Sequence, residues 1–493
     1  MFSKIKTKLH SHAELPLCQD ITPGESKPPS KIQILRNRKQ FGVNLGGLYV
    51  QEKYIDDTFI REGFETELDG VTNYISVNGV EKTRQDLQRH WRSYIDSIDW
   101  EWLRDQGTTC LRVPMGYWHV GPGFTRGTPF ESVSQVYGDA AWESFKQLCK
   151  TADANDIAIL FDLHGLPGGA NKNEHSGMKL SDAGFWKSKK YQSLVIELYE
   201  FVTKEFLANG LTNIFGLQLS NENDYCDLDA QKEFVGKAIN AIRALDPTMP
   251  IIISDSWDLN LWNEWLDKHS VDDSTTSGIV IDTHVYRCFD QRDRDKAVDK
   301  IIGDLSQELN HWGDKDNDII VGEYSCVLDT QSWDKSQGAS RDELVKQYGQ
   351  TESQLFKKLT MGAFFWTYKF KFGDGGEWGF VPMCERECLT NGQCKALSDG
   401  DLYATLEQKF SEHCSYWDSQ NGNAKYEHWR YKEGFITGCN DSLAFAQLAS
   451  SSVGSKRWIN SRKREHVLKF KSSSQEFVWE WEHGYATALS LFQ

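Results

Sequence analysis

Short runs of apolar residues alternate along most of the chain with stretches of helical period. Each run is apolar at consecutive positions, which is typical of strands buried on both faces. In the stretches between them apolar residues recur three and four positions apart, as in Leu87, Trp91 and Ile95, and this spacing predicts amphipathic helices. The eight runs are residues 41–47, 109–115, 157–164, 214–222, 250–257, 278–286, 318–325 and 362–368.

This alternation predicts the fold class. Strands buried on both faces that alternate with helices form parallel sheets covered by helices, and eight such units favour a closed (β/α)8 TIM barrel. A doubly wound open sheet is the alternative on the pattern alone. Polar residues gather where the runs end, and such barrels place their chemistry at the C-terminal ends of the strands. The position of the polar residues therefore supports the barrel.

The same pattern divides the chain into three segments. Residues 1–40 contain prolines and scattered charge, and we interpret them as an N-terminal leader. Residues 41–400 contain the predicted catalytic barrel. Residues 401–493 are predicted to be a C-terminal helical extension packed on the barrel, with helices around 431–448 and 477–491.

Composition and charge narrow the classes of partner. A chain of 493 residues, 39% of them hydrophobic, can bury one large core. The net charge of -16 argues against nucleic acids and anionic membranes, because both would repel an acidic surface. No segment approaches the roughly 20 continuous apolar residues of a transmembrane helix. The oligomeric state is left open.

The start of the chain and its cysteines bear on localisation. The first ten residues are basic, but no apolar stretch typical of a secretory signal follows them. The eleven cysteines, several of them inside predicted elements, suit reduced thiols better than a disulfide framework. We therefore expect a cytoplasmic protein. Mitochondrial association is the alternative, because a basic start also occurs in mitochondrial addresses.

Two carboxylates stand at the ends of predicted strands. Glu222 ends the run Leu-Gln-Leu-Ser-Asn-Glu, and Glu323 lies in Ile-Val-Gly-Glu-Tyr-Ser, 101 residues later. The mouth of a barrel would bring the two together. Retaining cleavage of a glycosidic bond needs two carboxyl groups about 5 to 5.5 Å apart, whereas inverting enzymes separate them by about 6.5 to 9.5 Å. We predict a retaining glycoside hydrolase with the shorter separation.

Neighbouring polar residues fit the same chemistry. Asn221 precedes Glu222 and is placed to donate to the 2-hydroxyl of a sugar, a contact that strengthens in the transition state. Arg112 and Tyr286, at the ends of other strands, are placed to hold Glu323 ionised.

Two histidines and a tryptophan also stand at strand ends. His164 and His284 are placed either to bind sugar hydroxyls or to orient the carboxylates. Most of the eighteen tryptophans suit packing, but Trp366 ends the last run, where its ring suits the apolar face of a sugar. These residues complete a predicted sugar-binding centre.

Seven motifs follow one another along residues 40–382. They are Gly-Val-Asn-Leu-Gly-Gly-Leu-Tyr-Val-Gln-Glu (42–52), Leu-Arg-Val-Pro-Met-Gly-Tyr-Trp (111–118), Asp-Leu-His-Gly-Leu-Pro-Gly (162–168), Asn-Glu (221–222), Thr-His-Val-Tyr (283–286), Gly-Glu-Tyr-Ser (322–325) and Phe-Phe-Trp-Thr-Tyr-Lys (364–369). The ordered set resembles glycoside hydrolase family 5, and most closely its fungal exo-β-1,3-glucanase branch.

This resemblance implies a (β/α)8 fold and a retaining mechanism without a metal ion or cofactor. It makes Glu222 the acid/base and Glu323 the nucleophile. It matches Glu52 and Glu174 to acidic groups that contact the hydroxyls of the terminal glucose. The residues to which it gives supporting roles at the sugar-binding centre are Arg112, His164, Asn221, His284, Tyr286 and Trp366.

The chain also departs from the family pattern. Asn223, Tyr324 and Tyr368 replace the last residues of the family's Asn-Glu-Pro, Gly-Glu-Trp and Trp-Thr-Trp motifs. Asn173 stands where exo-glucanases carry an aromatic residue, while Phe289 and Trp257 match other aromatics at the entrance. The departures leave the catalytic groups in place and bear on the outer part of the sugar-binding site.

We therefore predict a retaining, exo-acting β-glucosidase or exo-β-1,3-glucanase that acts on a β-glucoside or β-glucan. The alternative among enzymes is a β-glucosidase for glycolipids such as steryl glucosides or glycosphingolipids, which an apolar groove formed by the C-terminal segment would favour. A catalytically silent carbohydrate-binding protein is the alternative of another class, because fold does not imply function.

Overall fold

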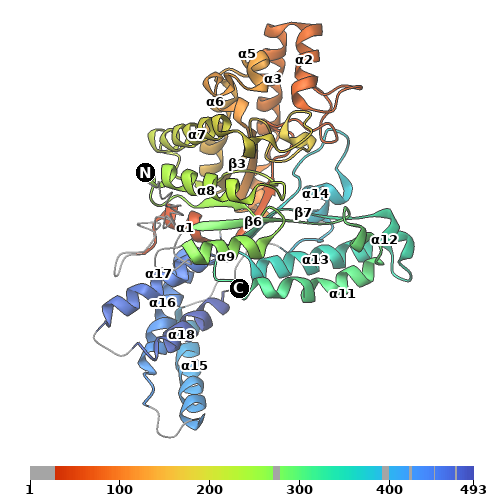
Figure 1. Cartoon of the computed structure of the whole chain (residues 1–493). Coiled ribbons are helices and arrows are strands. Elements are labelled where there is room, and N and C mark those ends of the chain that lie inside the picture. Colours follow the sequence, from red (N-terminus) through yellow and green to blue (C-terminus); the bar gives the residue numbers. More distant parts are fainter. Residues whose placement is uncertain are drawn as a thin grey trace, which may run out of the picture.

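The computed structural model describes residues 28–269, 278–390, 399–420, 425–448, 450–471 and 475–492. Its centre is a closed barrel of eight parallel strands in chain order (Figure 1). The strands are β1 (Gln40–Asn44), β2 (Cys110–Gly116), β3 (Ala158–Gly165), β4 (Ile214–Gln218), β5 (Ile251–Ser254), β6 (Ile279–Arg287), β7 (Asp318–Leu328) and β8 (Gly362–Phe365).

The predicted (β/α)8 barrel is confirmed. Strand β8 pairs with β1, with Ala363 opposite Phe41, so the sheet closes and the open-sheet alternative is wrong. The helices between the first and last strands are α2 (Glu67–Asn78), α3 (Val80–Asp96), α4 (Trp100–Asp105), α5 (Ser134–Tyr137), α6 (Ala140–Asp153), α7 (Lys189–Ala208), α8 (Leu228–Arg243), α9 (Leu259–His269), α10 (Gln291–Arg294), α11 (Val298–Leu309), α12 (Thr330–Lys335) and α13 (Arg341–Leu359), and α14 (Phe380–Glu385) follows β8.

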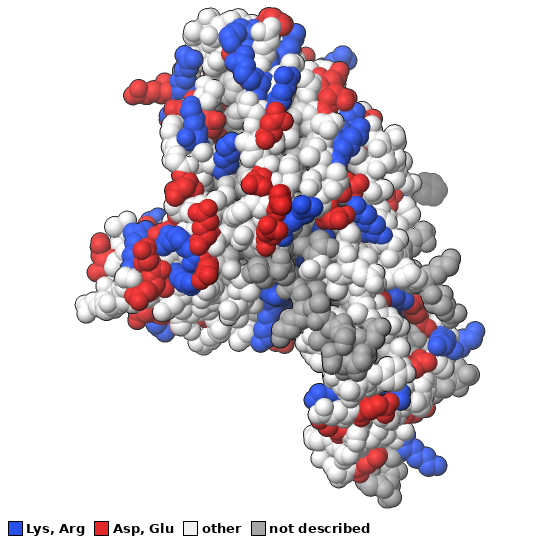
Figure 2. Space-filling model, turned by 180° about the vertical axis from the view of Figure 1, so that it is seen from behind, with Lys and Arg blue, Asp and Glu red and all other residues white. Residues whose placement is uncertain are grey.

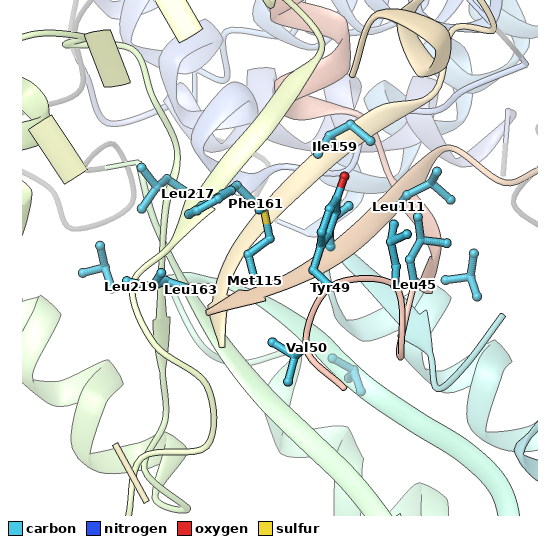
Figure 3. Packing of buried hydrophobic residues seen from close by; sticks show 14 of the residues in the cluster. Leu45, Tyr49, Val50, Leu111, Met115, Ile159, Phe161, Leu163, Leu217 and Leu219 are labelled. Atoms are coloured by element: carbon cyan, nitrogen blue, oxygen red, sulfur yellow. The ribbon is translucent and has the colours of Figure 1, made fainter. Parts of the chain in front are cut away.

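Side chains along each strand alternate between two separate apolar clusters. Leu111, Ile159 and Phe161 belong to the large outer cluster that packs against the helices, part of which is shown in Figure 3. Cys110 and Leu160, one position away, belong to a smaller cluster. Successive side chains of a strand point to opposite faces, so this smaller cluster fills the interior of the barrel.

The barrel interior changes from apolar to polar along the strands. The smaller cluster comes from the N-terminal parts of the strands and includes Phe215, Ile252 and Val280. Two residues further along, inward positions hold buried polar groups such as Arg112 and Asp162. We call these two zones the apolar floor and the polar layer. The polar layer lies toward the C-terminal ends of the strands.

Five strand ends differ from the prediction by three or four residues. Strand β1 ends at Asn44, β4 at Gln218, β5 at Ser254 and β8 at Phe365, each three or four residues before the predicted end, whereas β7 continues three residues further, to Leu328. Glu222 therefore lies in the loop after β4 and has a left-handed backbone with φ of 46°. A residue in this region cannot continue a strand, and non-glycine residues there often mark functional sites.

Four helices form the C-terminal segment, and a short helix precedes the barrel. Helices α16 (Trp429–Ala446) and α18 (Val478–Ser490) match the two predicted helices, whereas α15 (Asp399–Gln420) and α17 (Lys456–Lys469) were not predicted. Helices α16 and α18 cross closely, because a Cβ at Gly434 would lie 2.1 Å from the Trp481 carbonyl oxygen. Helix α1 (Lys31–Asn37) contains the buried Leu35. Residues 1–27 of the predicted leader lie outside the described residues.

The C-terminal segment docks at the N-terminal end of the barrel. Leu35 of α1 belongs to the apolar floor, and Leu448 packs against it. Asp318, the first residue of β7, accepts hydrogen bonds from Ser455 Oγ at 2.8 Å and from the Lys456 amide at 2.7 Å. Figure 1 shows α15 to α18 gathered on one side of the barrel. This segment lies opposite the polar layer.

On the face shown in Figure 2, lysine and arginine are interspersed with aspartate and glutamate, so charges of both signs are mixed there. The cysteines among the described residues are free thiols, as expected. Within the described part of the chain, no helix combines the length and the apolar character needed to span a membrane.

Candidate active site

Arg112 ties together the polar layer. Its side chain is fully buried, and an arginine has five N–H donors to satisfy. Each of the five N–H groups faces an acceptor, and these contacts fix the acceptor side chains in place. The acceptors are Gln218 Oε1 (2.9 Å), Asn44 Oδ1 (2.8 Å), Glu323 Oε1 (2.9 Å), Asn221 Oδ1 (2.8 Å) and Asp162 Oδ2 (3.0 Å).

Asp282 and Gly322 position the strand that carries Glu323. Asp282 on β6 accepts a hydrogen bond from the Gly322 amide at 2.7 Å and another from Gln218 Nε2 at 2.7 Å. A Cβ at position 322 would lie 2.2 Å from Asp282 Oδ1. Only glycine lets this carboxylate approach the backbone so closely. The glycine before Glu323 therefore has a steric cause.

Glu323 accepts hydrogen bonds from two donors. Arg112 donates to Oε1 at 2.9 Å, and the Tyr286 hydroxyl donates to Oε2 at 2.8 Å. These are the two contacts expected from the sequence. Donors and a nearby cation stabilise the ionised form, which is the form a nucleophile needs. The glutamate is 5% exposed, so its carboxylate is shielded from bulk water.

Glu222 lies between two histidines. Its Oε1 is 2.8 Å from His284 Nδ1, and its Oε2 is 3.1 Å from His175 Nε2. Burial opposes ionisation of Glu222, but the hydrogen bonds to His175 and His284 outweigh it and lower the pKa of the carboxyl. Burial also disfavours a charged His175, yet the hydrogen bond to Glu222 raises the pKa of His175 to about 9. The glutamate and the two imidazoles thus form a proton-holding group.

The two glutamates lie at a short separation. One carboxylate oxygen of each and a nitrogen of His284 all lie within 4.8 Å of one another. His284 Nδ1 is also 3.5 Å from Glu323 Oε2, so one imidazole bridges both carboxylates. This short approach fits the retaining separation of about 5 to 5.5 Å better than the inverting range of about 6.5 to 9.5 Å.

Asn221 is oriented by Arg112. Because Oδ1 of Asn221 accepts from Arg112, its Nδ2 faces His164 Nε2 and His175 Nδ1, each at 3.3 Å. His164 Nδ1 is 2.8 Å from Asp162 Oδ2, so we assign the ring proton to Nδ1 and the acceptor role to Nε2. Burial lowers the pKa of His164, which favours this neutral form.

Glu52 and Trp366 also reach the centre. Burial raises the pKa of Glu52 to about 8, and the negative charge of Glu323 raises it further. Trp366 Nε1 donates to the Tyr54 hydroxyl at 2.6 Å, and its ring stacks on His164 with centroids 6.1 Å apart. Both residues stand where the sequence placed them, beside the carboxylate pair.

Glu174 is not brought into the centre. It lies in a short 3-10 helix, residues Glu174–Ser176, and its side chain is exposed. Within the described residues the side chain has no hydrogen bond or ion pair. The neighbouring His175 contacts Glu222 instead. A contact of Glu174 with the terminal sugar stays a prediction.

Aromatic residues extend from the nucleophile to the surface. The rings of Phe289 and Trp378 lie 5.5 and 5.7 Å from that of Tyr286, which bonds Glu323. Phe289 and Trp257 are 62% and 54% exposed. Exposed aromatic rings beside a catalytic pair suit the apolar faces of sugars.

Comparison with known proteins identifies the family. The model of cellulase, glycosyl hydrolase family 5, matches residues 72–371. The chain belongs to glycoside hydrolase family 5. It is therefore a glycoside hydrolase on a TIM barrel, as its sequence predicted. A second family model, the glucan 1,3-beta-glucosidase 3 C-terminal domain, matches residues 401–493.

Relatives within family 5 cover nearly the whole chain. An uncharacterized glycosyl hydrolase of Saccharomyces cerevisiae is 37% identical over 94% of each chain. Glucan 1,3-beta-glucosidase 3 of Schizosaccharomyces pombe is 29% identical over 91% of this chain and 93% of its own. The solved rutinosidase of Aspergillus niger has a TM-score of 0.57 at 19% identity and covers 72% of this chain and 99% of its own, a likeness in fold.

Several site residues were not predicted. Asp282, Gln218 and Asn44 share the inward parity of His284 and Arg112 on the strands, so counting every second residue would have found them. Tyr54 and His175 lie in loops, where no periodicity marks a residue as inward. The donor set of Glu222, His284 and Glu323 also resembles a metal site. However, the Arg112 cation bonded to Glu323 opposes a second cation there, and a reaction without metal stays a prediction.

Proposed function

We propose that this family 5 enzyme is a retaining, exo-acting β-glucosidase of the glucan 1,3-β-glucosidase type. The carboxylate pair carries the proposal, because Glu222 and Glu323 lie within 4.8 Å and only Glu323 contacts a guanidinium. The Schizosaccharomyces pombe relative and the match of the C-terminal segment support the choice of substrate class.

The nucleophile acts first. The Glu323 carboxylate attacks the anomeric carbon and forms a glycosyl ester as the bond to the leaving oxygen breaks. Arg112 and Tyr286 hold the attacking oxygens in place and ionised. Asn221 is held by Arg112 beside the same carboxylate, as a donor to the 2-hydroxyl requires.

Glu222 supplies and recovers the proton. It protonates the leaving oxygen in the first step, and in the second it takes a proton from the water that cleaves the ester. His175 and His284 contact its two oxygens and lower its pKa, so the proton rests on the imidazoles between turnovers and passes through Glu222 to the leaving oxygen. The proton taken from the attacking water restores this buried group at the end of each turnover.

Exo action rests on the groups around the terminal sugar. Glu52, with its pKa raised to about 8 by burial, offers a neutral carboxyl to sugar hydroxyls at pH 7. The Trp366 ring provides a flat apolar face beside it. Product analysis on a long β-1,3-glucan tests the proposal. We expect glucose from the outset, whereas a ladder of oligosaccharides would show endo action.

A β-glucosidase for glycolipids would be favoured by an apolar groove that the C-terminal segment forms beside the carboxylate pair. The described C-terminal helices dock at the apolar floor, on the opposite side from the glutamates, so within the described residues they form no groove beside the carboxylate pair. Turnover of laminari-oligosaccharides, aryl β-glucosides and steryl glucosides should be compared directly. A preference for steryl glucosides would reverse our choice. A silent binding protein would leave the aryl β-glucoside intact.

We also propose a cytoplasmic location, on the grounds of the free thiols among the described residues. Fractionation of cells that express a C-terminally tagged chain tests it. Recovery of the protein in the mitochondrial fraction would favour the alternative, mitochondrial association.

A further inference from the structure

A second group of histidines and a carboxylate lies in the C-terminal segment, far from the catalytic mouth. His413 on α15, His428 at the start of α16 and Glu480 on α18 each offer one ligand atom, and the three atoms lie within 4.8 Å of one another. Glu480 Oε2 is 2.9 Å from His413 Nε2 and 2.7 Å from His428 Nδ1. The three residues therefore join three helices at one point.

We propose that His413, His428 and Glu480 form a zinc site that fastens the C-terminal helices together. Two imidazoles and a carboxylate are a common ligand set of Zn²⁺. Bond lengths of about 2.0 to 2.1 Å would place the ligand atoms roughly 3.3 Å apart, so the cluster opens by about half an ångström to admit the ion. A water molecule or another small ligand completes the tetrahedron.

The atoms that do not face the proposed ion are each engaged in a hydrogen bond. His428 Nε2 lies 3.2 Å from Asp418 Oδ1, and His413 Nδ1 lies 3.1 Å from His483 Nδ1. Glu480 Oε1 accepts from the amide of residue 427 at 2.8 Å. Ligand histidines in metal sites commonly donate their other N–H to a carboxylate or similar acceptor, which fixes the tautomer and directs the free nitrogen at the metal.

Charge favours a cation at this point. Glu480 is fully buried, and in the described part of the chain it contacts no lysine or arginine. Asp441, another fully buried carboxylate of the same segment, is bonded instead by the guanidinium of Arg462 at 2.5 and 2.9 Å. A buried carboxylate needs a compensating partner. Zn²⁺ with two neutral imidazoles would balance Glu480 and Asp418.

Aromatic rings close the site. The His413 ring stacks on Tyr431 with centroids 4.2 Å apart, and the His428 ring stacks on Tyr426 at 5.5 Å. His413 is only 4% exposed. Such walls hold the two imidazoles in place and favour a tightly held ion over an exchangeable one.

The first test measures zinc binding to the full chain. The protein is stripped with EDTA, dialysed and titrated with ZnCl2 by calorimetry, and its zinc content is measured by mass spectrometry. We expect one zinc per chain and a higher melting temperature with zinc. A stripped wild type that takes up no zinc, or whose melting temperature zinc does not raise, would overturn the proposal.

Variants locate the ion. His428→Asn should weaken zinc binding by at least 100-fold. The exposed Asp418→Asn should weaken it by about 10- to 100-fold without disturbing the helices, because it removes only the partner of His428. His466→Asn, a buried histidine of the same segment outside the cluster, should keep its zinc. Glu323→Gln should keep it also. Loss of zinc in Glu323→Gln with retention in His428→Asn would assign the metal to the catalytic mouth and sink the proposal.

Discussion

The two ends of the barrel interior are built from the same strands but hold opposite kinds of side chain. Leu160 on β3 lies in the apolar floor, and Asp162, two residues later, lies in the polar layer bonded to Arg112. The floor is closed by Leu35 and Leu448, whereas the polar layer supports two glutamates. Changes in the floor should therefore cost stability alone, and changes in the polar layer should cost catalysis as well.

The largest effect is expected at the carboxylate pair. Glu323→Ala should reduce turnover of an activated aryl β-glucoside by about 10⁴-fold or more, because the glycosyl ester cannot form. Added azide should then give the α-glucosyl azide. In Glu222→Ala the ester still forms from a good leaving group, and azide should give the β-glucosyl azide.

Nuclear magnetic resonance of the two azide products checks this prediction. Swapped stereochemistry would exchange the roles of Glu222 and Glu323. Circular dichroism of both variants serves as the control for folding.

The second largest effect is expected for Arg112→Met. This substitution removes four hydrogen bonds and the ion pair with Asp162, and leaves the buried Asp162 and Glu323 without their cation. We expect kcat to fall by about 10²- to 10³-fold, as when a single electrostatic contact is lost, and the free energy of unfolding to fall by about 3 to 5 kcal/mol. Steady-state kinetics and urea unfolding measure the two effects. Near-normal kcat would mean that Tyr286 alone keeps Glu323 ionised.

A smaller effect is expected at His175. This histidine holds a proton up to a pKa of about 9 through its contact with Glu222. In His175→Asn the buried group loses the imidazole that holds its proton up to a pKa of about 9, so the alkaline limb of kcat/KM should move to lower pH and activity at pH 8 should fall about tenfold. If the alkaline limb of the kcat/KM profile does not move, the catalytic proton is held by His284 and Glu222 without His175.

The stability of His175→Asn provides a second readout. The folded pKa lies above the ordinary value of 6.5, so the stabilisation is fully present below pH 6.5 and is lost as pH rises through about 9. The difference in unfolding free energy between wild type and variant should shrink across that window.

Leu160→Ala should have the smallest effect on turnover. It opens a cavity in the apolar floor and should lower the free energy of unfolding by about 2 to 5 kcal/mol. Because the Leu160 side chain packs in the apolar floor and has no polar atom that could bond a catalytic group, kcat of the folded protein should stay within about twofold of wild type. A large fall in kcat would show that the floor and the polar layer are coupled.

This division also explains what the sequence could predict. The strands were visible because residues such as Ile159 and Leu160 are apolar on both faces. Glu222 and Glu323 were visible because each follows such a run. His175 was not, because its position depends on the loop after β3 and on contacts with Asn221 from the loop after β4. Helix α17 was missed because charged residues fill most of it, and its few buried groups show no apolar period.

Contacts between the segment before β1 and the C-terminal segment, made at the apolar floor, have a consequence for biosynthesis. Arg38 bonds Ser451, 413 residues later, and the Lys39 amide donates to the Ser452 carbonyl at 2.7 Å. The ribosome makes about 5 to 20 residues per second, so the 83 residues from the end of β8 to Leu448 take roughly 4 to 17 s to synthesise. During that interval the hydrophobic floor lacks Leu448 and the segment beside β1. A chaperone that binds exposed apolar surface would find its target on the nascent chain at this end of the barrel.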